Sequence, residues 1–350
     1  MHPNGIRHVL GRDILVDYKV FVDARLLPGL SIVSMGRVAY TFCEAEEHEF
    51  AGIEQLFEPD RRKPGWATWK YLRNPDGVAR VFVAKDNTDA VVGSLAHVPR
   101  RFTSAQTGPL SVLQVVDVFV RADLRQQAVF LGLLQYARQR IDGPRIGFPN
   151  DASGAFGAGL GWRALGPFET WEFPVVVGQL LVQRNLAVVA SAGDVLSKIY
   201  TSTLLPSDRG IEMKRIARFN GDYALNPTLI HGVRSADYLN WRFVDNPVTV
   251  YHAYEFLEDD EPIGYCVYAR ARASVALSDF VTTRSRRRCL RLLVDHCREI
   301  AADRIQFSGT GLKLTDLGFL RRNGHGGCLG FHVPDVRWLL TSCDIDSEPE

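Results

Sequence analysis

The sequence predicts an α/β protein in which one mixed arrangement of helices and strands is built twice. Three observations carry this prediction. Strand and helix patterns alternate along most of the 350 residues. A seven-residue box rich in aromatic residues occurs twice, and the same features follow each copy of the box in the same order. A repeat of this length exceeds a solenoid unit, so it indicates two domains of one fold rather than an array.

The box Trp69-Lys70-Tyr71-Leu72-Arg73-Asn74-Pro75 matches Trp241-Arg242-Phe243-Val244-Asp245-Asn246-Pro247, which lies 172 residues later. Three further matches follow in order: Val92-Gly93 with Ile263-Gly264, Asp117 with Asp279, and Gly161-Trp162 with Gly318-Phe319. The offset falls steadily to 157 residues, as expected if the second copy has shorter loops. We interpret the large rings of the two boxes, Trp69 and Trp241, as core residues of a helix.

The predicted elements of the first copy alternate between strands and helices. In order they are a strand at 37–42, a helix at 44–57, a helix that holds Trp66 and ends at Asn74-Pro75, strands at 81–84 and 91–97, a strand that ends at Val120, a helix, a strand at 145–148, a short helix at 152–158 and a strand at 169–177. The predicted organisation is an N-terminal extension (1–36), a first domain (37–177), a connector (178–235), a second domain (236–340) and a tail (341–350).

The stretch from Val116 to Phe130 has the most informative pattern. It predicts a buried strand, a short polar turn and an amphipathic helix. The apolar residues at helical spacing are Leu124, Ala128, Leu131, Leu134, Ala137 and Ile141. The start of such a helix presents unpaired N–H groups and the positive end of the helix dipole, which suit a phosphate. The alternative is an ordinary strand–helix joint whose end is capped by water.

This stretch resembles the pyrophosphate-binding segment of the GNAT acyltransferase superfamily. Val120 takes the place of the valine that ends the strand, and Arg125 that of the first loop residue. Ala128 replaces the family's glycine, Phe130 replaces a small residue, and the turn has no proline. The resemblance extends over residues 37–176 and 195–335, and both copies are similar to tandem GNAT-like proteins. It implies two mixed-sheet GNAT-like domains in tandem.

The resemblance also implies an acyl-coenzyme A (acyl-CoA), such as acetyl-CoA, as co-substrate. The residues implied to bind it are Val118, Phe119, Val120, Arg125, Gln126, Gln127, Ala128, Val129, Phe130 and Asn150. The methyl group of Ala128 is compatible with this role if its dihedrals are helical, and Phe130 can point into the core. Asn150 is either an amide that contacts coenzyme A or a turn residue.

Two residues are candidates for the general base of an acyl transfer. Asp117 stands in an apolar strand, where burial would raise its pKa; the alternative is a structural carboxylate, which Asp279 in the matching place favours. His97 in the neighbouring strand is the second candidate, although a strand histidine is more often a satisfied polar group. The tyrosine with which many GNAT enzymes protonate the leaving thiolate is replaced by Gly157 and Leu314.

The second copy has a run of arginines, Arg284 to Arg288, and no glycine in place of the loop. A basic run is usually a solvated face, so we expect this half to be mainly structural and to form one wall of the acceptor pocket. An anion site there is the lesser alternative.

Composition excludes several classes of function. A net charge of +1 does not suggest binding to nucleic acid or to an anionic membrane. No apolar run is long enough to span a bilayer, and the first residues lack the pattern of a signal peptide. The six cysteines show no Cys-x-x-Cys spacing, which argues against a zinc site and a disulfide framework. We therefore expect a cytoplasmic protein without a metal.

These observations predict an acyl-CoA-dependent N-acyltransferase that acts on a small-molecule or sugar amine between the two halves. One alternative is an aminoacyl transferase of the FemAB type, which the basic run motivates and the near-neutral charge disfavours. The other is a catalytically inactive tandem GNAT-like protein that serves in binding or assembly.

Overall fold

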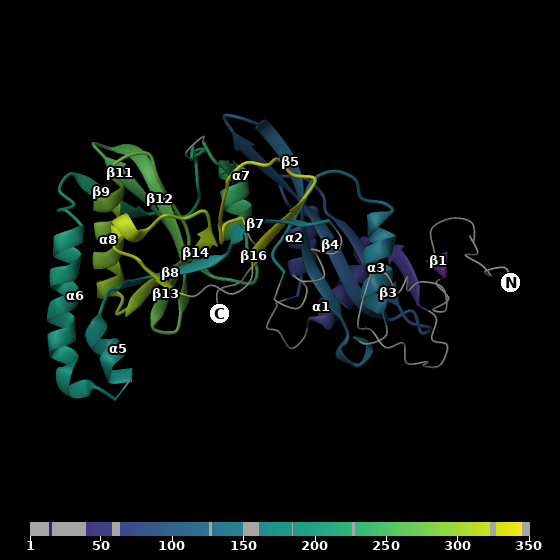
Figure 1. Ribbon diagram of the computed structural model, residues 1–350, viewed down its shortest axis with the longest axis horizontal. Coiled ribbons are helices and arrows are strands. Elements are labelled where there is room, and N and C mark those ends of the chain that lie inside the picture. The colour runs from purple at the N-terminus through teal and green to yellow at the C-terminus, as the bar shows by residue number, and fades with distance from the viewer. Residues whose placement is uncertain are drawn as a thin grey trace.

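Two mixed sheets, one for each copy of the repeat, lie side by side along the long axis of the molecule (Figure 1). The computed structural model describes residues 14–15, 40–57, 64–125, 128–149, 161–183, 185–225, 228–322 and 327–344. Between residues 40 and 147 the helices and strands follow the order that the sequence predicts, whereas the strand at 163–167 was not predicted.

The first sheet has the strand order β2-β3-β4-β5-β6-β16-β7, in which only β5 and β6 pair in parallel. A two-residue strand, β1 (Ile14–Leu15), extends its edge beside β2. The bounds are β2 Thr41–Glu44, β3 Arg80–Lys85, β4 Val91–Ser104, β5 Gly108–Val120, β6 Arg145–Gly147, β16 Gly327–Phe331 and β7 Arg163–Pro167.

The second sheet repeats this arrangement in the order β9-β11-β12-β13-β14-β8-β15, and only β13 and β14 pair in parallel. The bounds are β9 Ile211–Arg215, β11 Tyr251–Glu258, β12 Glu261–Ala271, β13 Ser274–Thr282, β14 Arg304–Thr310, β8 Glu169–Pro174 and β15 Leu320–Arg322.

The two halves exchange one strand. The strand β8 comes from the first half of the sequence but pairs with β14 in the second sheet, and β16 comes from the second half but pairs with β6 in the first sheet. In Figure 1 the teal β8 accordingly lies in the green half of the molecule. The domain boundary that the sequence suggests near residue 177 therefore does not coincide with the division between the two sheets.

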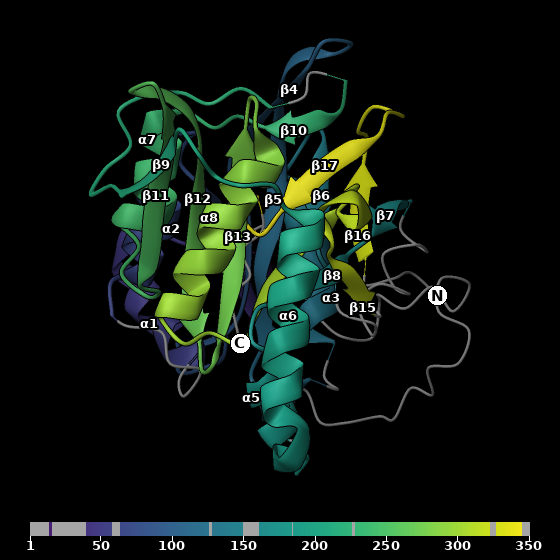
Figure 2. The same ribbon diagram turned by 90° about the vertical axis from the view of Figure 1, so that its left-hand side faces the viewer.

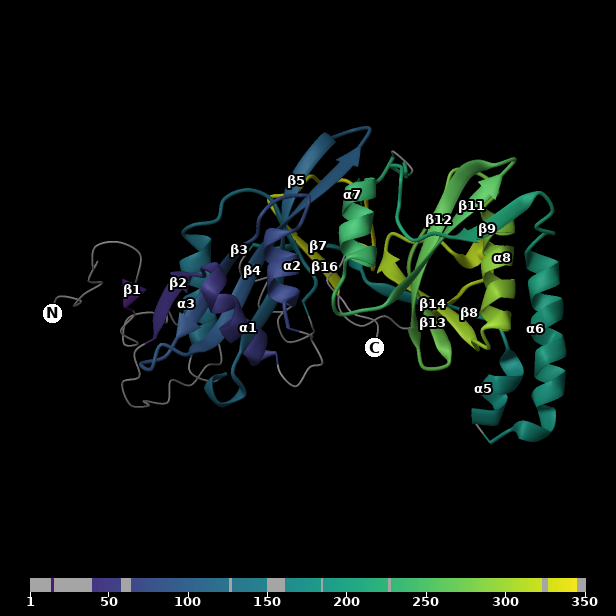
Figure 3. The ribbon, with the colours of Figure 1, turned by 180° about the vertical axis from the view of Figure 1, so that it is seen from behind.

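The helices of the first half cover both faces of its sheet (Figures 1 and 3). On one face α1 (Phe50–Leu56) and α2 (Trp66–Leu72) pack on Val81, Val83 and Val98. On the other face α3 (Val129–Arg138) packs on Phe42 and Phe82. Short 3-10 turns precede α1 and α3: η1 (Glu47–Glu49) and η2 (Ala122–Leu124).

The predicted register of α3 is wrong. The helix begins at Val129 rather than near Leu124, and its buried face consists of Val129, Leu133, Tyr136 and Ala137. Leu131 and Leu134 are only half-buried. The prediction fails because the turn at η2 separates Leu124 from the helix, although the apolar residues on either side of the turn continue at helical spacing. Gly132 lies directly against the ring of Phe42, where no side chain would fit.

In the second half, α7 (Ala236–Leu239) continues into a π-helix, η4 (Asn240–Val244), on one face of the sheet, and α8 (Arg286–Glu299) covers the other. A hairpin of α5 (Val177–Gln183) and α6 (Ala190–Leu204) packs outside α8 (Figure 2). Two further 3-10 turns are η3 (Ala187–Val189) and η5 (Thr315–Leu317).

Two short parallel strands join the sheets. β10 (Ile230–Gly232) pairs with β4, β17 (Trp338–Thr341) pairs with β14, and the two pair with each other. The strand predicted at 169–177 ends at Pro174, where α5 follows. The helix predicted at 152–158 lies outside the described residues. Within the described part of the chain, no helix is both long and apolar enough to cross a membrane.

Candidate functional site

A bulge in β5 is the first feature of the candidate site. Phe119 pairs with Ser94 and Val116 pairs with Ala96, so β5 holds one residue more than β4 between these two pairs. Within the bulge, Asp117 has a left-handed backbone with a φ of 51°. The Ser94 hydroxyl donates to its carbonyl oxygen at 2.8 Å. Bulges of this kind bend a strand and end its pairing with a neighbour.

Beyond the bulge, β5 and β6 separate. Their parallel pairing covers only Leu113 to Val115 of β5, opposite Arg145 to Gly147. From Val116 to Val120, no described strand pairs with β5 on the side of β6. Val118 is 44% exposed, which is unusual for valine in a sheet. The backbone of β5 is thus open to an extended ligand at this point.

The start of α3 stands at the end of this open strand. Ala128 precedes the helix with φ 52° and ψ 14°, and its methyl side chain makes no capping hydrogen bond. The expectation that Ala128 has helical dihedrals is therefore wrong: it adopts the left-handed conformation that glycine adopts most easily. The turn therefore has a conformation typical of glycine but carries a methyl group.

The other predicted cofactor residues lie around this turn. Phe130 is half-buried and packs on the core, as expected. The Arg125 guanidinium donates to the Val120 carbonyl at 3.3 Å and lies over the Phe119 ring, so its side chain folds back on the strand. Gln126, Gln127 and Asn150 lie outside the described residues.

Asp117 is held by two side chains of α2. The Lys70 ammonium donates to both carboxylate oxygens at 3.0 and 2.8 Å, and the Tyr71 hydroxyl donates to one of them at 2.8 Å. The side chains of Lys70 and Asp117 are 5% and 1% exposed. The ammonium supplies the counter-charge that a buried carboxylate needs, which favours the structural alternative for Asp117.

This role of Lys70 and Tyr71 was not predicted from the sequence. A signal for their role was present, because a carboxylate in an apolar strand requires a partner and the box holds a lysine beside a tyrosine. Asp279, the matching residue, is also paired: it accepts from Arg234 at 2.7 Å and from Tyr265 at 2.6 Å.

Replacement of Asp117 by asparagine is expected to lower the free energy of unfolding by about 2–3 kcal/mol. Asparagine retains an acceptor for Tyr71, but the Lys70 ammonium loses its counter-charge. Urea unfolding measures the effect, and the double variant Lys70→Met/Asp117→Asn should recover part of it. Unchanged stability together with a loss of kcat alone would instead favour the role of Asp117 as a base.

His97 lies on the opposite face of the sheet, where its ring packs edge-on against Phe82 at 5.8 Å. Burial, with smaller effects of Arg145 and Arg80, lowers the pKa of His97 to about 3. The imidazole is therefore neutral at physiological pH and a weak base. It is separated from Asp117 by the sheet, so the two candidates do not form one catalytic pair.

The matching gap in the second half is filled by the chain itself. β17 pairs with β14 at Thr341, and the Cys343 N–H then donates to the Ser278 carbonyl of β13 at 3.0 Å. Cys343 and Asp344 are 0% and 1% exposed. The C-terminal plug, residues 341–344, thus occupies the space between β13 and β14. The prediction of a tail from residue 341 is wrong for these four residues.

The start of α8 is also occupied. Ser285 precedes it with φ 54°, the conformation of Ala128, and Glu258 reaches the same place. Arg284 and Arg288 donate to the Glu258 carboxylate at 2.7 and 2.8 Å. The Glu258 carboxylate therefore occupies the position in which an anionic ligand would contact these arginines.

The halves meet at the two boxes. The rings of Trp69 and Trp241 stack with their centroids 4.9 Å apart, and each indole N–H donates to the other's carbonyl at 3.0 Å. Both are buried, as expected, but at the interface between the halves. The adjacent cavity, which Lys70, Gln114 and Asp344 help to line, has about 20 Å³, room for one water molecule. An acceptor molecule does not fit there.

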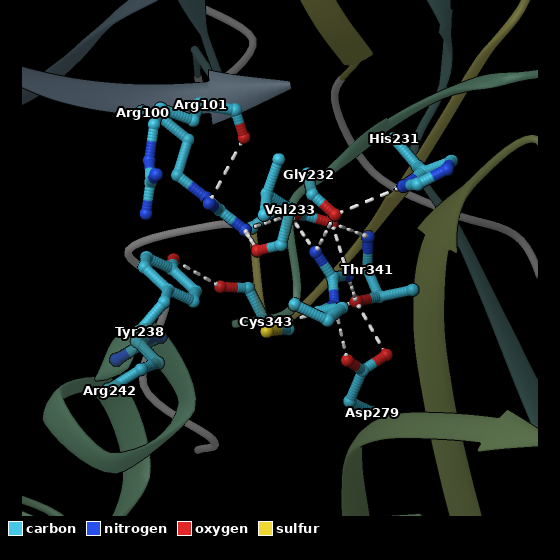
Figure 4. Close-up of polar contacts among 12 residues, drawn as sticks. Arg100, Arg101, His231, Gly232, Val233, Tyr238, Arg242, Asp279, Thr341 and Cys343 are labelled. Carbon is cyan, nitrogen blue, oxygen red and sulfur yellow. Dashed lines mark hydrogen bonds and ion pairs between the residues drawn. The ribbon is translucent and has the colours of Figure 1, made fainter. Parts of the chain in front are cut away.

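A buried charge network lies beside this interface (Figure 4). Arg234 donates to Asp344 at 2.6 and 2.7 Å and to Asp279, while Arg100 of the first half donates to Asp344 at 3.1 Å. The Arg100 guanidinium lies 3.5 Å from the centroid of the Tyr238 ring. The network joins β4, the start of α7 and the C-terminal plug. Among the described residues, no cluster of His, Cys, Asp and Glu could hold a metal ion.

Two solved structures share this architecture. A GCN5-related N-acetyltransferase from Anabaena variabilis is 14% identical, with a TM-score of 0.57 over 83% of this chain and 72% of its own. A conserved protein of unknown function from Enterococcus faecalis, titled a probable N-acyltransferase, is 7% identical, with a TM-score of 0.58 over 83% and 71%. No family model and no curated protein matches the sequence. The tandem GNAT fold that the sequence predicts is confirmed.

Proposed function

We propose that the protein is an acyl-CoA-dependent N-acyltransferase with a single acyl-CoA site, in its first half. The difference between the two halves is the observation that carries this proposal. No described strand pairs with β5 beyond Val115 on the side of β6, whereas the C-terminal plug and Glu258 occupy the matching places beside β13 and α8. One half retains a site that the other half has filled.

The residues around the gap suit the parts of an acyl-CoA. The exposed backbone of β5 near Val118 offers hydrogen bonds to an extended amide chain. The positive end of the helix dipole at the start of α3 suits a pyrophosphate. Gln126, Gln127 and Asn150 complete the proposed set. The bound acyl-CoA supplies a thioester, the activated acyl group of the reaction.

The acceptor is proposed to be a weakly basic amine, such as that of an amino sugar. Asp117 is tied to Lys70, and His97 is a weak base, so neither removes a proton readily from an ammonium group. A weakly basic amine has an appreciable neutral fraction near pH 7 and would attack the thioester carbonyl without a strong base. The C–S bond then breaks, coenzyme A leaves as its thiolate, and the surplus proton of the amine reaches that thiolate through water.

A groove of about 460 Å³ is the proposed acceptor site. It lies between α1 and the β3–β4 turn, and Arg121, which follows β5, forms part of its wall. His48 and Glu49 of η1, Lys85 of β3 and Asp89 of the β3–β4 turn give it polar groups of both charges. Such a lining suits a small polar amine better than a long apolar one.

Calorimetric titration with acetyl-CoA tests the proposal. We expect one molecule bound per chain, and binding abolished by Ala128→Glu, which places a negative charge where the pyrophosphate would lie. Ser285→Glu, the matching change in the second half, is the control and should leave binding intact. Absence of heat and of competition by coenzyme A would contradict the proposal, and two bound molecules would contradict the single site.

The inactive tandem GNAT-like protein is the second candidate, and the engaged state of Asp117 favours it. Mass spectrometry of the natively purified protein separates the two, since co-purified coenzyme A supports the enzyme. The aminoacyl transferase of the FemAB type has less support, because Arg284 and Arg288 are paired with Glu258.

A further inference from the structure

The hairpin of α5 and α6 carries an unusual concentration of exposed apolar side chains. Eleven large apolar side chains are exposed in the described chain, and seven of them lie between Val182 and Ile199. They are Val182, Leu186, Val188, Val189, Val195, Leu196 and Ile199, and Val188 at the tip is 99% exposed. Clusters of this kind mark interaction surfaces, whereas single exposed apolar residues are ordinary.

The helix α6 turns only part of its apolar surface inward. Gly193, Ser197 and Thr201 are buried, and Tyr200 and Leu204 pack against the core of the second half. Gly193 packs against Leu181 of α5, and the Arg298 guanidinium of α8 donates to the Thr201 hydroxyl at 2.5 Å. The aliphatic side chains, Val195 and Leu196 above all, face outward. A surface helix normally places such residues toward its own core, so this outer face is built for a partner.

The outer residues follow the spacing of a helix–helix seam. Val188, Ala192, Val195, Ile199 and Ser202 are separated alternately by four and three residues, which is the 3.5-residue period of helices that pack along their length. All residues of α6 at these positions are exposed. The pattern therefore predicts that another helix lies along α6.

The seam residues, together with the exposed Leu196 beside them, are complementary to a second copy of themselves. If two copies of α6 pack antiparallel about a two-fold axis between Val195 and Leu196, these two residues face each other across the axis. Ala192, the small residue of the seam, then faces Ile199, a large one. Self-complementary matching of small and large residues is what a two-fold interface requires.

Charge and area agree with this partner. Lys198 is the only charged residue among the exposed residues of α6, so two copies meet with little repulsion. A bilayer would require a cluster of basic residues rather than one lysine. Fifteen residues of helix span about 22 Å, and two paired hairpin faces of that length bury roughly 1,000 Å² together, near the lower limit of a specific interface.

We propose that the protein forms a two-fold dimer through antiparallel packing of α6 and the hairpin tip. The hairpin lies at the end of the molecule opposite the first half (Figures 1 and 2). The dimer therefore leaves the gap beside β5 and the groove near Arg121 accessible in both copies.

Sedimentation velocity of the full chain over a range of concentrations tests the dimer. We expect the wild-type chain to be dimeric at tens of micromolar and Leu196→Glu to be monomeric with an unchanged thermal midpoint. Val250→Glu is the matched control: Val250 is 72% exposed in the same half but outside the hairpin, and this variant should remain dimeric. A monomeric wild-type chain, or a dimer that survives Leu196→Glu, overturns the proposal.

Cysteine crosslinking tests the antiparallel register. Under oxidation, Val195→Cys beside the axis should give a covalent dimer. Ile199→Cys should not, because its copies lie roughly 10 Å apart along the helix axis in this register. Crosslinking of both variants would indicate parallel helices, and crosslinking of neither would place the contact elsewhere; either result overturns the register.

Discussion

Replacement of Asp344 by alanine is expected to lower the free energy of unfolding by about 5 kcal/mol, at the upper end of what the loss of a buried ion partner costs. Asp344 accepts from two arginines, and its removal leaves two buried cations without this carboxylate. Arg234 and Arg100 have fully buried guanidinium groups, with side chains 0% and 2% exposed. The variant also releases the C-terminal plug, because the Thr341 N–H donates to Asp344 at 3.1 Å. Urea unfolding measures the change.

Asp335→Ala is the control, since the Asp335 side chain is 97% exposed and its ion pair with Arg163 should contribute little. The effect also has a predicted pH dependence. Burial alone would raise the pKa of Asp344, but Arg234 and Arg100 outweigh it and hold the pKa below 3.8. A lowered carboxyl pKa stabilises the fold above pH 4, and this contribution is lost as the pH falls through the folded-state value. The difference in free energy of unfolding between the wild type and Asp344→Ala should therefore become smaller in acid. A difference that does not change with pH would contradict the explanation by ion pairing.

Replacement of Trp69 by alanine is expected to cost about 3–5 kcal/mol, the range for truncating a buried aromatic side chain. Trp69 is 7% exposed and packs among Phe219, Tyr238 and Trp241 of the second half. The variant loses the stacked ring and the hydrogen bond to the Trp241 carbonyl, and the halves lose their central contact. Chemical unfolding of the variant measures the loss.

Two further variants identify the source of that loss. Trp69→Phe keeps most of the ring contact and loses the hydrogen bond. The lost hydrogen bond should cost about 1 kcal/mol in addition to the cost of the smaller ring. Trp241→Ala should match Trp69→Ala, and the double variant should cost much less than the two added together, because each ring is the other's partner. Additive effects would show that the two rings act independently.

The sequence predicted more of the fold than of the site. The two boxes and the order of strands and helices revealed the repeat, because hydrophobic periods of two and 3.6 residues are local properties of the chain. A further match, Arg145-Ile146-Gly147-Phe148 with Arg304-Ile305-Gln306-Phe307, supports it in β6 and β14. The left-handed turn at Ala128 escaped prediction, because alanine gives no sign of a positive φ.

The roles of the charged residues were harder to predict from the sequence than the fold. Asp117 was visible as a carboxylate in an apolar strand, but its partners Lys70 and Tyr71 lie 47 and 46 residues away in the sequence. Asp344 lies among acidic residues near the last residue of the sequence, so the sequence predicts that it belongs to a tail. Its contacts with Arg234 and Arg100, 110 and 244 residues earlier, show that it is a core residue.

The sequence by itself determined that one fold is built twice and where the open strand and its helix lie. The tertiary structure alone decided that β8 and β16 change places, that the C-terminal plug fills the second gap, and that α6 presents its aliphatic face outward. The physical reason is common to all three. The alternation of a strand and the period of a helix specify which side of the element is apolar, but not which element of the chain covers that side. That choice is made by packing between residues far apart in the sequence, and here it leaves the two copies of one fold with different roles.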